Sequence, residues 1–90
     1  MPNELTKVKR AIRDQRFAFG THCLDEIAAD LLSLREVVLS VLAATDFDVL
    51  TDDPSHARYR IFGISDTGRN IVSIVIYSNR QVFFKTVYEA

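Results

Sequence analysis

The apolar positions near the start of the chain recur at helical spacing. Leu5, Val8, Ala11 and Ile12 follow the i, i+3, i+6, i+7 pattern of an amphipathic helix. Asn3 stands where an N-cap belongs. We therefore predict a first helix that begins next to Asn3 and buries this apolar stripe.

Two more helices are predicted before the apolar period changes. Residues 17–19 make a short extended piece that ends at Gly20, and Thr21 suits the N-cap of a helix that starts at His22. The apolar stripe of this helix, expected to pack on a sheet, is Leu24, Ile27, Ala28 and Leu31. Ser33 to Glu36 spells a capping box, so a third helix starts near Leu34 and ends around residues 43–45.

From residue 47 onward the pattern is that of strands, because β-branched and aromatic residues concentrate between turn signals. Four strands are predicted at 47–51, 57–65, 69–77 and 81–88. The turns between them are Asp52 to Pro54, Asp66 to Gly68, and either Ser78–Asn79 or Asn79–Arg80. The prediction is one α+β domain over residues 1–90, with two to three N-terminal helices packed on a four-stranded antiparallel β-meander.

Both faces of this sheet are expected to be largely apolar. With a two-residue final turn, one face carries Val72, Ile74, Ile76, Phe83, Lys85 and Val87, and the other carries Val75, Tyr77, Val82, Phe84, Thr86 and Tyr88. The helices cover one face. The second face suggests a partner such as a second copy of the chain, unless the N-terminal helix covers it.

Composition and charge narrow the class of protein. The chain has 90 residues, 48% apolar and 26% charged, as expected for an ordinary globular domain. The longest apolar stretch, Val37 to Ala44, is too short for a bilayer, and residues 1–16 are too charged for a signal peptide, so we expect a cytoplasmic protein that contacts no membrane. Cys23 is the one cysteine, which excludes an internal disulfide and favours a core position.

Charge is segregated along the chain. Residues 1–19 carry five basic and two acidic side chains, residues 20–56 carry one and eight, and residues 57–90 carry five and two. Both ends are therefore mildly basic and the middle is strongly acidic, although the net charge is only −1. A dedicated nucleic-acid-binding protein usually has a larger basic excess.

Two groups of polar residues are candidates for chemistry. His22, Glu26 and Asp30 lie at i, i+4 and i+8, roughly opposite the apolar stripe, where the histidine has a carboxylate neighbour that suits a general base. The simpler interpretation, a solvated helix face, is favoured. The second group, on the strands, is Arg58, Arg60, Arg69, Arg80 and Lys85. These cations suit phosphates, but they also suit edge strands that avoid aggregation, which we favour. Nothing at ligand spacing indicates a metal site.

Short motifs occur in a characteristic order along nearly the whole chain, from about Val8 to the C-terminus. They are Thr21-His22-x-x-x-Glu26-x-x-x-Asp30, Ser33-x-x-Glu36-Val37, Gly63 followed by Gly68-Arg69, and Lys85-Thr86-Val87-Tyr88-Glu89. In these motifs the chain resembles the bacterial family DUF4258. The stretch from Asp53 to Arg69 is also similar to the BrnT toxins.

The resemblance implies a RelE-like fold, shared with the RelE and barnase-like ribonuclease toxins, in which any active site lies on the open face of the sheet. The family has no established general function. Many members carry arginine where this chain has Glu26 and Asp30. The lack of these arginines argues against a catalytic role for this helix.

Ribonuclease toxins of this kind let the ribose 2′-hydroxyl attack the adjacent phosphate, which needs a base, a cation and an acid. The residues carried over as catalytic are His22, Glu26, Lys85 and Tyr88, and those carried over as nucleic-acid-binding are Arg58, Arg60, Arg69 and Arg80. His22 would be base or acid, Lys85 or an arginine would hold the phosphate, and Tyr88 would donate a proton. No metal or cofactor is required.

Two functions are consistent with this sequence. We favour a noncatalytic interaction or regulatory module that binds protein or nucleic acid, because the pI of about 6.0 is acidic and the family arginines are missing. The alternative is a metal-independent endoribonuclease toxin of a toxin–antitoxin pair, which His22, Lys85 and Tyr88 support. The expected partners are an antitoxin or other protein, RNA, or a second copy of the chain.

Overall fold

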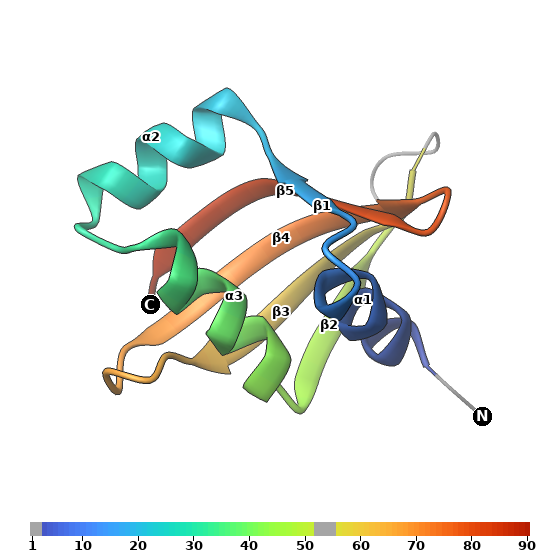
Figure 1. Cartoon of the computed structure of the whole chain (residues 1–90), viewed down its shortest axis with the longest axis horizontal. Coiled ribbons are helices and arrows are strands. Elements are labelled where there is room, and N and C mark those ends of the chain that lie inside the picture. Colours follow the sequence, from blue (N-terminus) through green and yellow to red (C-terminus); the bar gives the residue numbers. More distant parts are fainter. Residues whose placement is uncertain (1–2, 52–55) are drawn as a thin grey trace.

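A computed structural model describes residues 3–51 and 56–90, which form three helices and a five-stranded mixed sheet (Figure 1). The helices are α1 (Glu4–Arg13), α2 (Thr21–Ala29) and α3 (Leu34–Ala43). The strands are β1 (Phe17–Phe19), β2 (Asp46–Leu50), β3 (Arg58–Ile64), β4 (Asn70–Ser78) and β5 (Gln81–Glu89). The turn predicted at Asp52 to Pro54 lies outside the described residues.

The strand order is β1-β5-β4-β3-β2. Strands β2 to β5 form the predicted antiparallel meander, whereas β1 pairs with β5 in parallel. The α+β class is therefore confirmed. The prediction of a four-stranded, wholly antiparallel sheet is wrong, because the short extended piece at 17–19 joins the sheet as a fifth strand.

Aromatic packing explains why so short a segment becomes a strand. Phe17 and Phe19 alternate with the exposed Ala18, so both rings point to the side of the sheet that holds the core. The ring of Phe19 stacks on Phe84 of β5 with centroids 4.4 Å apart, and Phe17 meets Phe84 edge-on at 6.2 Å. The strand is short because Gly20 follows and begins the turn into α2.

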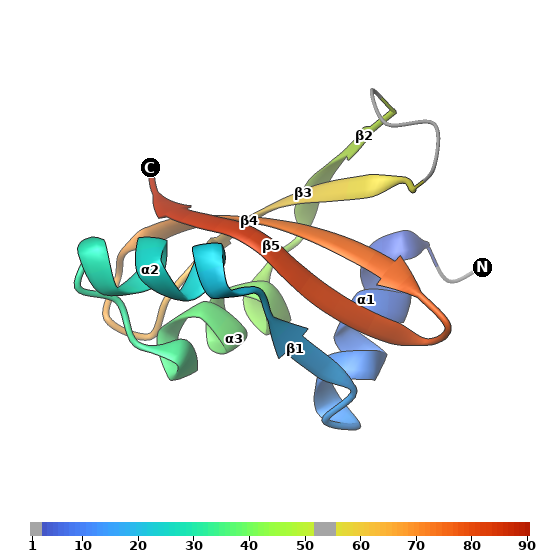
Figure 2. The same ribbon diagram turned by 90° about the horizontal axis from the view of Figure 1, so that it is seen from above.

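All three helices lie on one side of the sheet, as Figure 2 shows from above. The stripe predicted for the first helix is confirmed: Leu5, Val8, Ala11 and Ile12 are buried in one cluster with residues of α2, α3 and the sheet. The suggestion that the N-terminal helix covers the second face is therefore wrong. That face carries no helix in the described part of the chain.

A β-bulge corrects the predicted arrangement of side chains on β5. Ile74 pairs with Thr86, but the next residue, Val75, pairs with Phe84, so Lys85 is one extra residue in the strand. Up to Phe84 the predicted faces hold. Beyond the bulge they are exchanged: Val87 turns toward the helices and is fully buried, while Thr86 and Tyr88 share the face of Val72 and Ile74.

The local signals for turns and caps are mostly confirmed. Asn79 and Arg80 form the two-residue turn between β4 and β5, with φ of 53° and 61°, and Gly68 takes φ of 84° in the turn between β3 and β4. Asn3 caps α1 through a 2.9 Å bond from the Thr6 N–H, and the Ser33–Glu36 capping box is complete.

The cap of α2 differs from the prediction. Gly20 is its N-cap rather than Thr21, and the helix starts at Thr21. The Gly20 N–H donates to the Phe84 carbonyl at 3.0 Å, so this residue still belongs to the extended chain beside β5. Attachment to the sheet therefore decides where the helix begins.

The packing face predicted for α2 is confirmed only at Ile27. Cys23, a predicted core residue, is buried beside it, but Leu24 and Leu31 are 41% and 84% exposed. Glu26 is half-buried instead. The helix turns its carboxylates, not its leucines, toward β5.

Gly63 of β3 sets the distance between α3 and the sheet. A Cβ placed on Gly63 would lie 2.0 Å from the Ser40 carbonyl oxygen, which is helix backbone and cannot rotate away. No side chain fits in that gap. The close approach buries Val37, Val41 and Ser40 against the sheet, and the Ser40 hydroxyl is satisfied by donating to the Val37 carbonyl at 2.7 Å.

We predict that Gly63→Ala lowers the free energy of unfolding by about 3 kcal/mol or more, because α3 must move off the sheet to admit one methyl group. Urea denaturation followed by circular dichroism measures the loss. Gly68→Ala is the matched control: its Cβ meets no atom within 4 Å and only the positive φ opposes it, so about 1 to 2 kcal/mol is expected. Equal losses in the two variants would contradict the packing explanation.

Candidate functional site

The side of the sheet that faces away from the helices is here called the open face. Pairing in register places Phe62, Val72 and Tyr88 side by side across β3, β4 and β5 on this face. Its apolar members on β3, β4 and β5 are Phe62, Ile64, Val72, Ile74, Ile76, Phe83 and Tyr88, and Leu50 of β2 lies on the same face by register. Apolar side chains therefore run along β4 on the open face and continue onto Phe62 and Ile64 of β3 and onto Phe83 and Tyr88 of β5.

The centre of the open face is shielded by its own side chains. Val72 is only 5% exposed although it is not part of the helix-side core, because Phe62 and Tyr88 flank it. Other side chains of the open face are more open to solvent: Ile64 is 59% exposed, Phe83 42% and Tyr88 39%. Large apolar groups that gather in one exposed patch mark interaction surfaces more often than isolated ones do.

Charged groups occupy the β2 side of the open face. Arg60 forms an ion pair of 2.9 Å with Asp48 on the neighbouring strand, and its guanidinium carbon lies 5.7 Å from the centre of the Phe62 ring. Arg58 and Asp46 lie on the same face by register. Two arginines and two aspartates leave this edge nearly neutral.

Two hollows lie toward opposite ends of the open face. One, of about 400 Å³, is lined by residues that include Arg16, Ala18, Ile76, Asn79 and Phe83. The other, of about 360 Å³, is lined mainly by apolar residues that include Phe62, Ile64, Val72 and Ala90. Both are open to solvent, so the open face is not flat.

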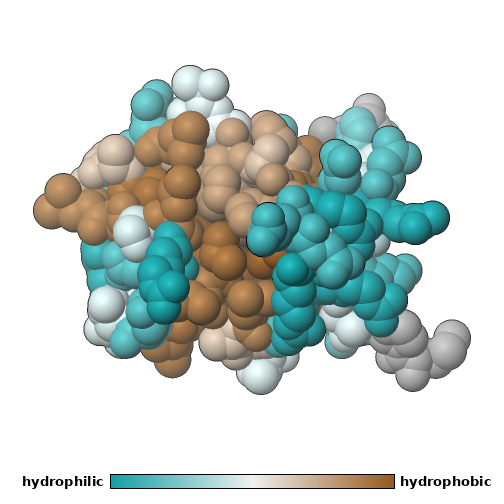
Figure 3. Space-filling model, viewed as in Figure 1, coloured by the Kyte–Doolittle hydropathy of each residue, from teal (hydrophilic) through white to brown (hydrophobic). Residues whose placement is uncertain are grey.

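The helix side exposes apolar groups of its own. Figure 3 shows hydrophobic side chains over the region of α2 and α3, and hydrophilic ones over α1. The exposed leucines of this side are Leu24, Leu31 and Leu34. Leu31 also has a positive φ of 56°, since it follows the end of α2 in a Schellman turn where the Leu32 N–H reaches the Ile27 carbonyl.

His22, Glu26 and Asp30, predicted to share a helix face, do so, and that face lies along the outer edge of β5. Glu26 accepts the Val87 N–H at 3.3 Å through Oε1, and Asp30 accepts the Glu89 N–H at 2.9 Å. The other Glu26 oxygen lies 3.4 Å from His22 Nε2. The two carboxylates thus accept the N–H groups that a neighbouring strand would otherwise accept. The His22 side chain is 80% exposed.

Lys85 and Tyr88, the other predicted catalytic residues, are both exposed. Lys85 is the bulge residue of β5, and Tyr88 lies on the open face. Among the described residues, no hydrogen bond or ion pair links His22 or Glu26 to either of them. The four residues are not gathered into one hydrogen-bonded group, and their catalytic roles stay predictions.

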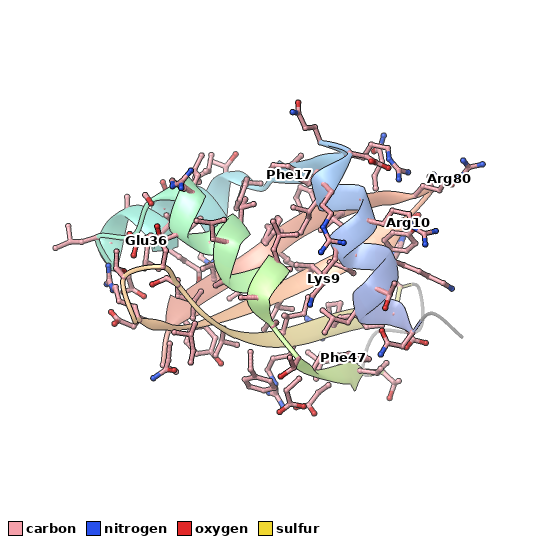
Figure 4. All side chains as sticks on the ribbon, turned by 60° about the horizontal axis from the view of Figure 1, so that its bottom comes forward. Lys9, Arg10, Phe17, Glu36, Phe47 and Arg80 are labelled. Carbon is pink, nitrogen blue, oxygen red and sulfur yellow. The ribbon has the colours of Figure 1, made fainter. Side chains whose placement is uncertain are left out.

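The four arginines predicted to bind nucleic acid are distributed over three places. Arg58 and Arg60 lie on the open face, whereas Arg80 sits at the tip of the β4–β5 turn and points away from the sheet (Figure 4). Arg69 is held on the helix side by the carbonyls of Asp30 and Leu31. These four cations therefore form no single basic surface.

Arg69 makes the densest polar network of the described chain. Its Nε and Nη2 donate to the Glu89 carboxylate at 3.1 and 2.6 Å, and Nη1 lies 3.9 Å from Glu36. The hydrogen bond from Arg69 lowers the pKa of Glu89. Bonds from the Thr67 hydroxyl and the Ser33 N–H lower the pKa of Glu36, which Figure 4 shows beside the β3–β4 turn. No local sequence signal predicts the partners of Arg69.

Sequence reasoning also missed Phe62 and Ile64 as members of the open face. The sequence of β3 contains a signal for this face, because its residues alternate between two sets: Arg58, Arg60, Phe62 and Ile64 on one side, and Tyr59, Ile61 and Gly63 on the other. To use this signal, one must also know that the helices pack on the side of Ile61, which is 1% exposed.

Several classes of site find no support within residues 3–51 and 56–90. No group of three or more His, Cys, Asp and Glu side chains is placed to hold a metal ion. None of the helices described is long and apolar enough to cross a membrane. Burial raises the pKa of the Cys23 thiol to about 11, so it is a packing residue and not a nucleophile. Comparison with protein-family models, curated proteins and solved structures finds no match.

We predict that Glu26→Ala lowers the free energy of unfolding by about 1 kcal/mol, because the Val87 N–H loses its acceptor. Glu26→Gln keeps an oxygen in place and should lose less. His22→Ala removes only the exposed partner of Glu26, so its free energy of unfolding should stay within about 0.5 kcal/mol of the wild-type value. Urea denaturation of the three variants measures this order. A loss in His22→Ala as large as that in Glu26→Ala would contradict the structural role of Glu26.

We predict that the Glu89–Arg69 pair makes a pH-dependent contribution to the stability of the fold. Since the pKa of Glu89 is lower in the folded protein than its ordinary value of 4.5, the pair stabilises fully above about pH 4.5 and loses its contribution as the pH falls through the folded pKa. Glu89→Gln should therefore melt at a lower temperature than the wild type at pH 7. The two melting curves should converge toward pH 3. Asp25→Asn, which changes an exposed carboxylate of α2, is the control, and convergence in it as well would contradict the assignment.

Proposed function

We propose that this chain is a noncatalytic interaction module that docks a protein partner on its open face. The observation that supports this most is the absence of any helix on that face in the described residues, although its central strands carry seven apolar side chains. The strands of an antiparallel sheet that is covered on one face only normally alternate apolar with polar residues. Here apolar residues occupy both faces of β4.

The chemistry of the open face favours protein over nucleic acid. Phosphate binding requires cations that gather on one surface. Of the four predicted arginines, only Arg58 and Arg60 lie on the open face, and Arg60 is paired with Asp48. A protein partner instead gains from burying Ile64, Phe83 and Tyr88.

We further propose that the fold is RelE-like and that the resemblance to DUF4258 reflects this. Three helices on one side of a mainly antiparallel sheet, with the other side open, agree with that proposal. An antitoxin is one protein partner that such a face suits. The endoribonuclease alternative has less support, since Glu26 and Asp30 serve as acceptors for the backbone of β5.

Site-specific photo-crosslinking in cells that produce the chain tests the docking proposal. Benzoylphenylalanine in place of Phe83 probes the open face, and the same probe in place of Leu31 probes the helix side at a more exposed position. We expect a discrete protein adduct from the Phe83 probe and none from the Leu31 probe. Mass spectrometry identifies what is attached.

Three results would overturn the proposal. A protein adduct from the Leu31 probe alone would move the docking surface to the helix side. An RNA adduct at Phe83 would replace the protein partner by nucleic acid. Cleavage of RNA by the purified wild type, lost in both His22→Ala and Lys85→Ala, would establish the endoribonuclease instead.

A further inference from the structure

We propose that the occupant of the open face is a second copy of this chain, which stacks on it face to face about a two-fold axis. This inference rests on the proposed docking role and names the partner. Two sheets that pack face to face lie about 10 Å apart and interdigitate their inner side chains. Such a dimer has the helices of both copies on the outside and the two open faces as a shared core.

The size of the molecule suits this arrangement. Its principal dimensions are 32 × 25 × 22 Å. A broad face of this extent is on the order of the ~800 Å² that each partner contributes to a stable interface. A partner much smaller than the chain would leave part of the apolar strip exposed, whereas an identical copy matches its length.

The charge of the open face permits two identical copies to meet. A two-fold axis brings like surfaces together, so a face with a strong net charge repels itself. The open face carries Asp46 and Asp48 against Arg58 and Arg60, and the Arg60–Asp48 pair already neutralises two of them at 2.9 Å. The charges that segregate along the sequence lie mostly on α1, α2 and the loops, away from this face.

Shape gives a second reason for an identical partner. The most exposed apolar side chains of the open face, Ile64 and Phe83, stand toward opposite ends of it, and a hollow lies next to each. In a two-fold stack, any side chain of one copy that enters a hollow of the other is matched by the same contact in reverse. The face therefore offers both the protrusions and the hollows that self-packing needs.

Association through the β2 edge of the sheet is less favourable than association through the face. β2 is one of the two outer strands, so two copies could pair there as one longer sheet. Antiparallel self-pairing centred on β2 would set Asp48 opposite Asp48 of the other copy, with Asp46 close by. Like charges that face each other across strands are destabilising, so the β2 edge is protected against self-pairing and the open face is not.

Sedimentation equilibrium tests the dimer. The wild type should associate with a Kd of about 1 to 10 μM. Ile64→Arg should weaken association by about tenfold or more, because a guanidinium would be buried in an apolar interface. Leu31→Arg is the matched control, since it places the same group at an even more exposed apolar position on the helix side and should dimerise as the wild type does. Tyr88→Arg repeats the test in case Ile64→Arg alters the fold, which thermal melting detects.

The outcomes separate the two proposals. A wild type that stays monomeric throughout the micromolar range overturns the dimer. If Phe83 then crosslinks to a different protein, the docking role stands without it. Dimers that persist in Ile64→Arg and Tyr88→Arg but dissociate in Leu31→Arg place the interface on the helix side and overturn both proposals. Loss of dimer in the two open-face variants alone supports both.

Discussion

The position of the helix layer depends on the backbone N–H groups along the outer edge of β5, which need hydrogen-bond acceptors. β1 pairs only with the first part of β5, and Gly20 donates to the Phe84 carbonyl where that pairing ends. Beyond this point the backbone N–H groups along the edge have no neighbouring strand to accept them. Glu26 and Asp30 supply them, so α2 must run along β5 with its carboxylates inward. The exposure of Leu24 follows from this, not from any local preference.

Arg69 fixes the same helix layer at the C-terminal end of β5. Its guanidinium joins Glu89 at the end of the strand to the carbonyls of Asp30 and Leu31 at the end of α2, and it lies near Glu36 at the start of α3. Five donors in one planar group suit this arrangement, which lysine cannot reproduce. With α2 and α3 held here, and with α1 buried in the same core, no described helix is left to cover the open face.

The division of the sheet into a covered and an open face also decides what the candidate residues can do. Glu26 and Arg69, which the sequence suggests as catalytic and nucleic-acid-binding, serve the helix side as structural contacts. Tyr88 reaches the open face only because the bulge at Lys85 reverses the alternation of β5. What that face then presents is an apolar surface with nearly balanced charge, which supports the proposed docking role.

The sequence by itself determined the local elements: the amphipathic first helix, the capping box at Ser33, the strands of the meander and the turns at Gly68 and Asn79. Each depends on residues a few positions apart, so its signal is present in the sequence. Only the tertiary structure decided that residues 17–19 form a strand, that Lys85 is a bulge, and which way α2 faces. The strand and the orientation of α2 depend on contacts between residues about sixty positions apart: Gly20 bonds the Phe84 carbonyl, and Glu26 accepts a backbone N–H of β5. The local sequence of one segment does not reveal such distant contacts. The candidate site follows the same rule, because the side chains of the open face are recognisable as a group only once the position of the helices is known.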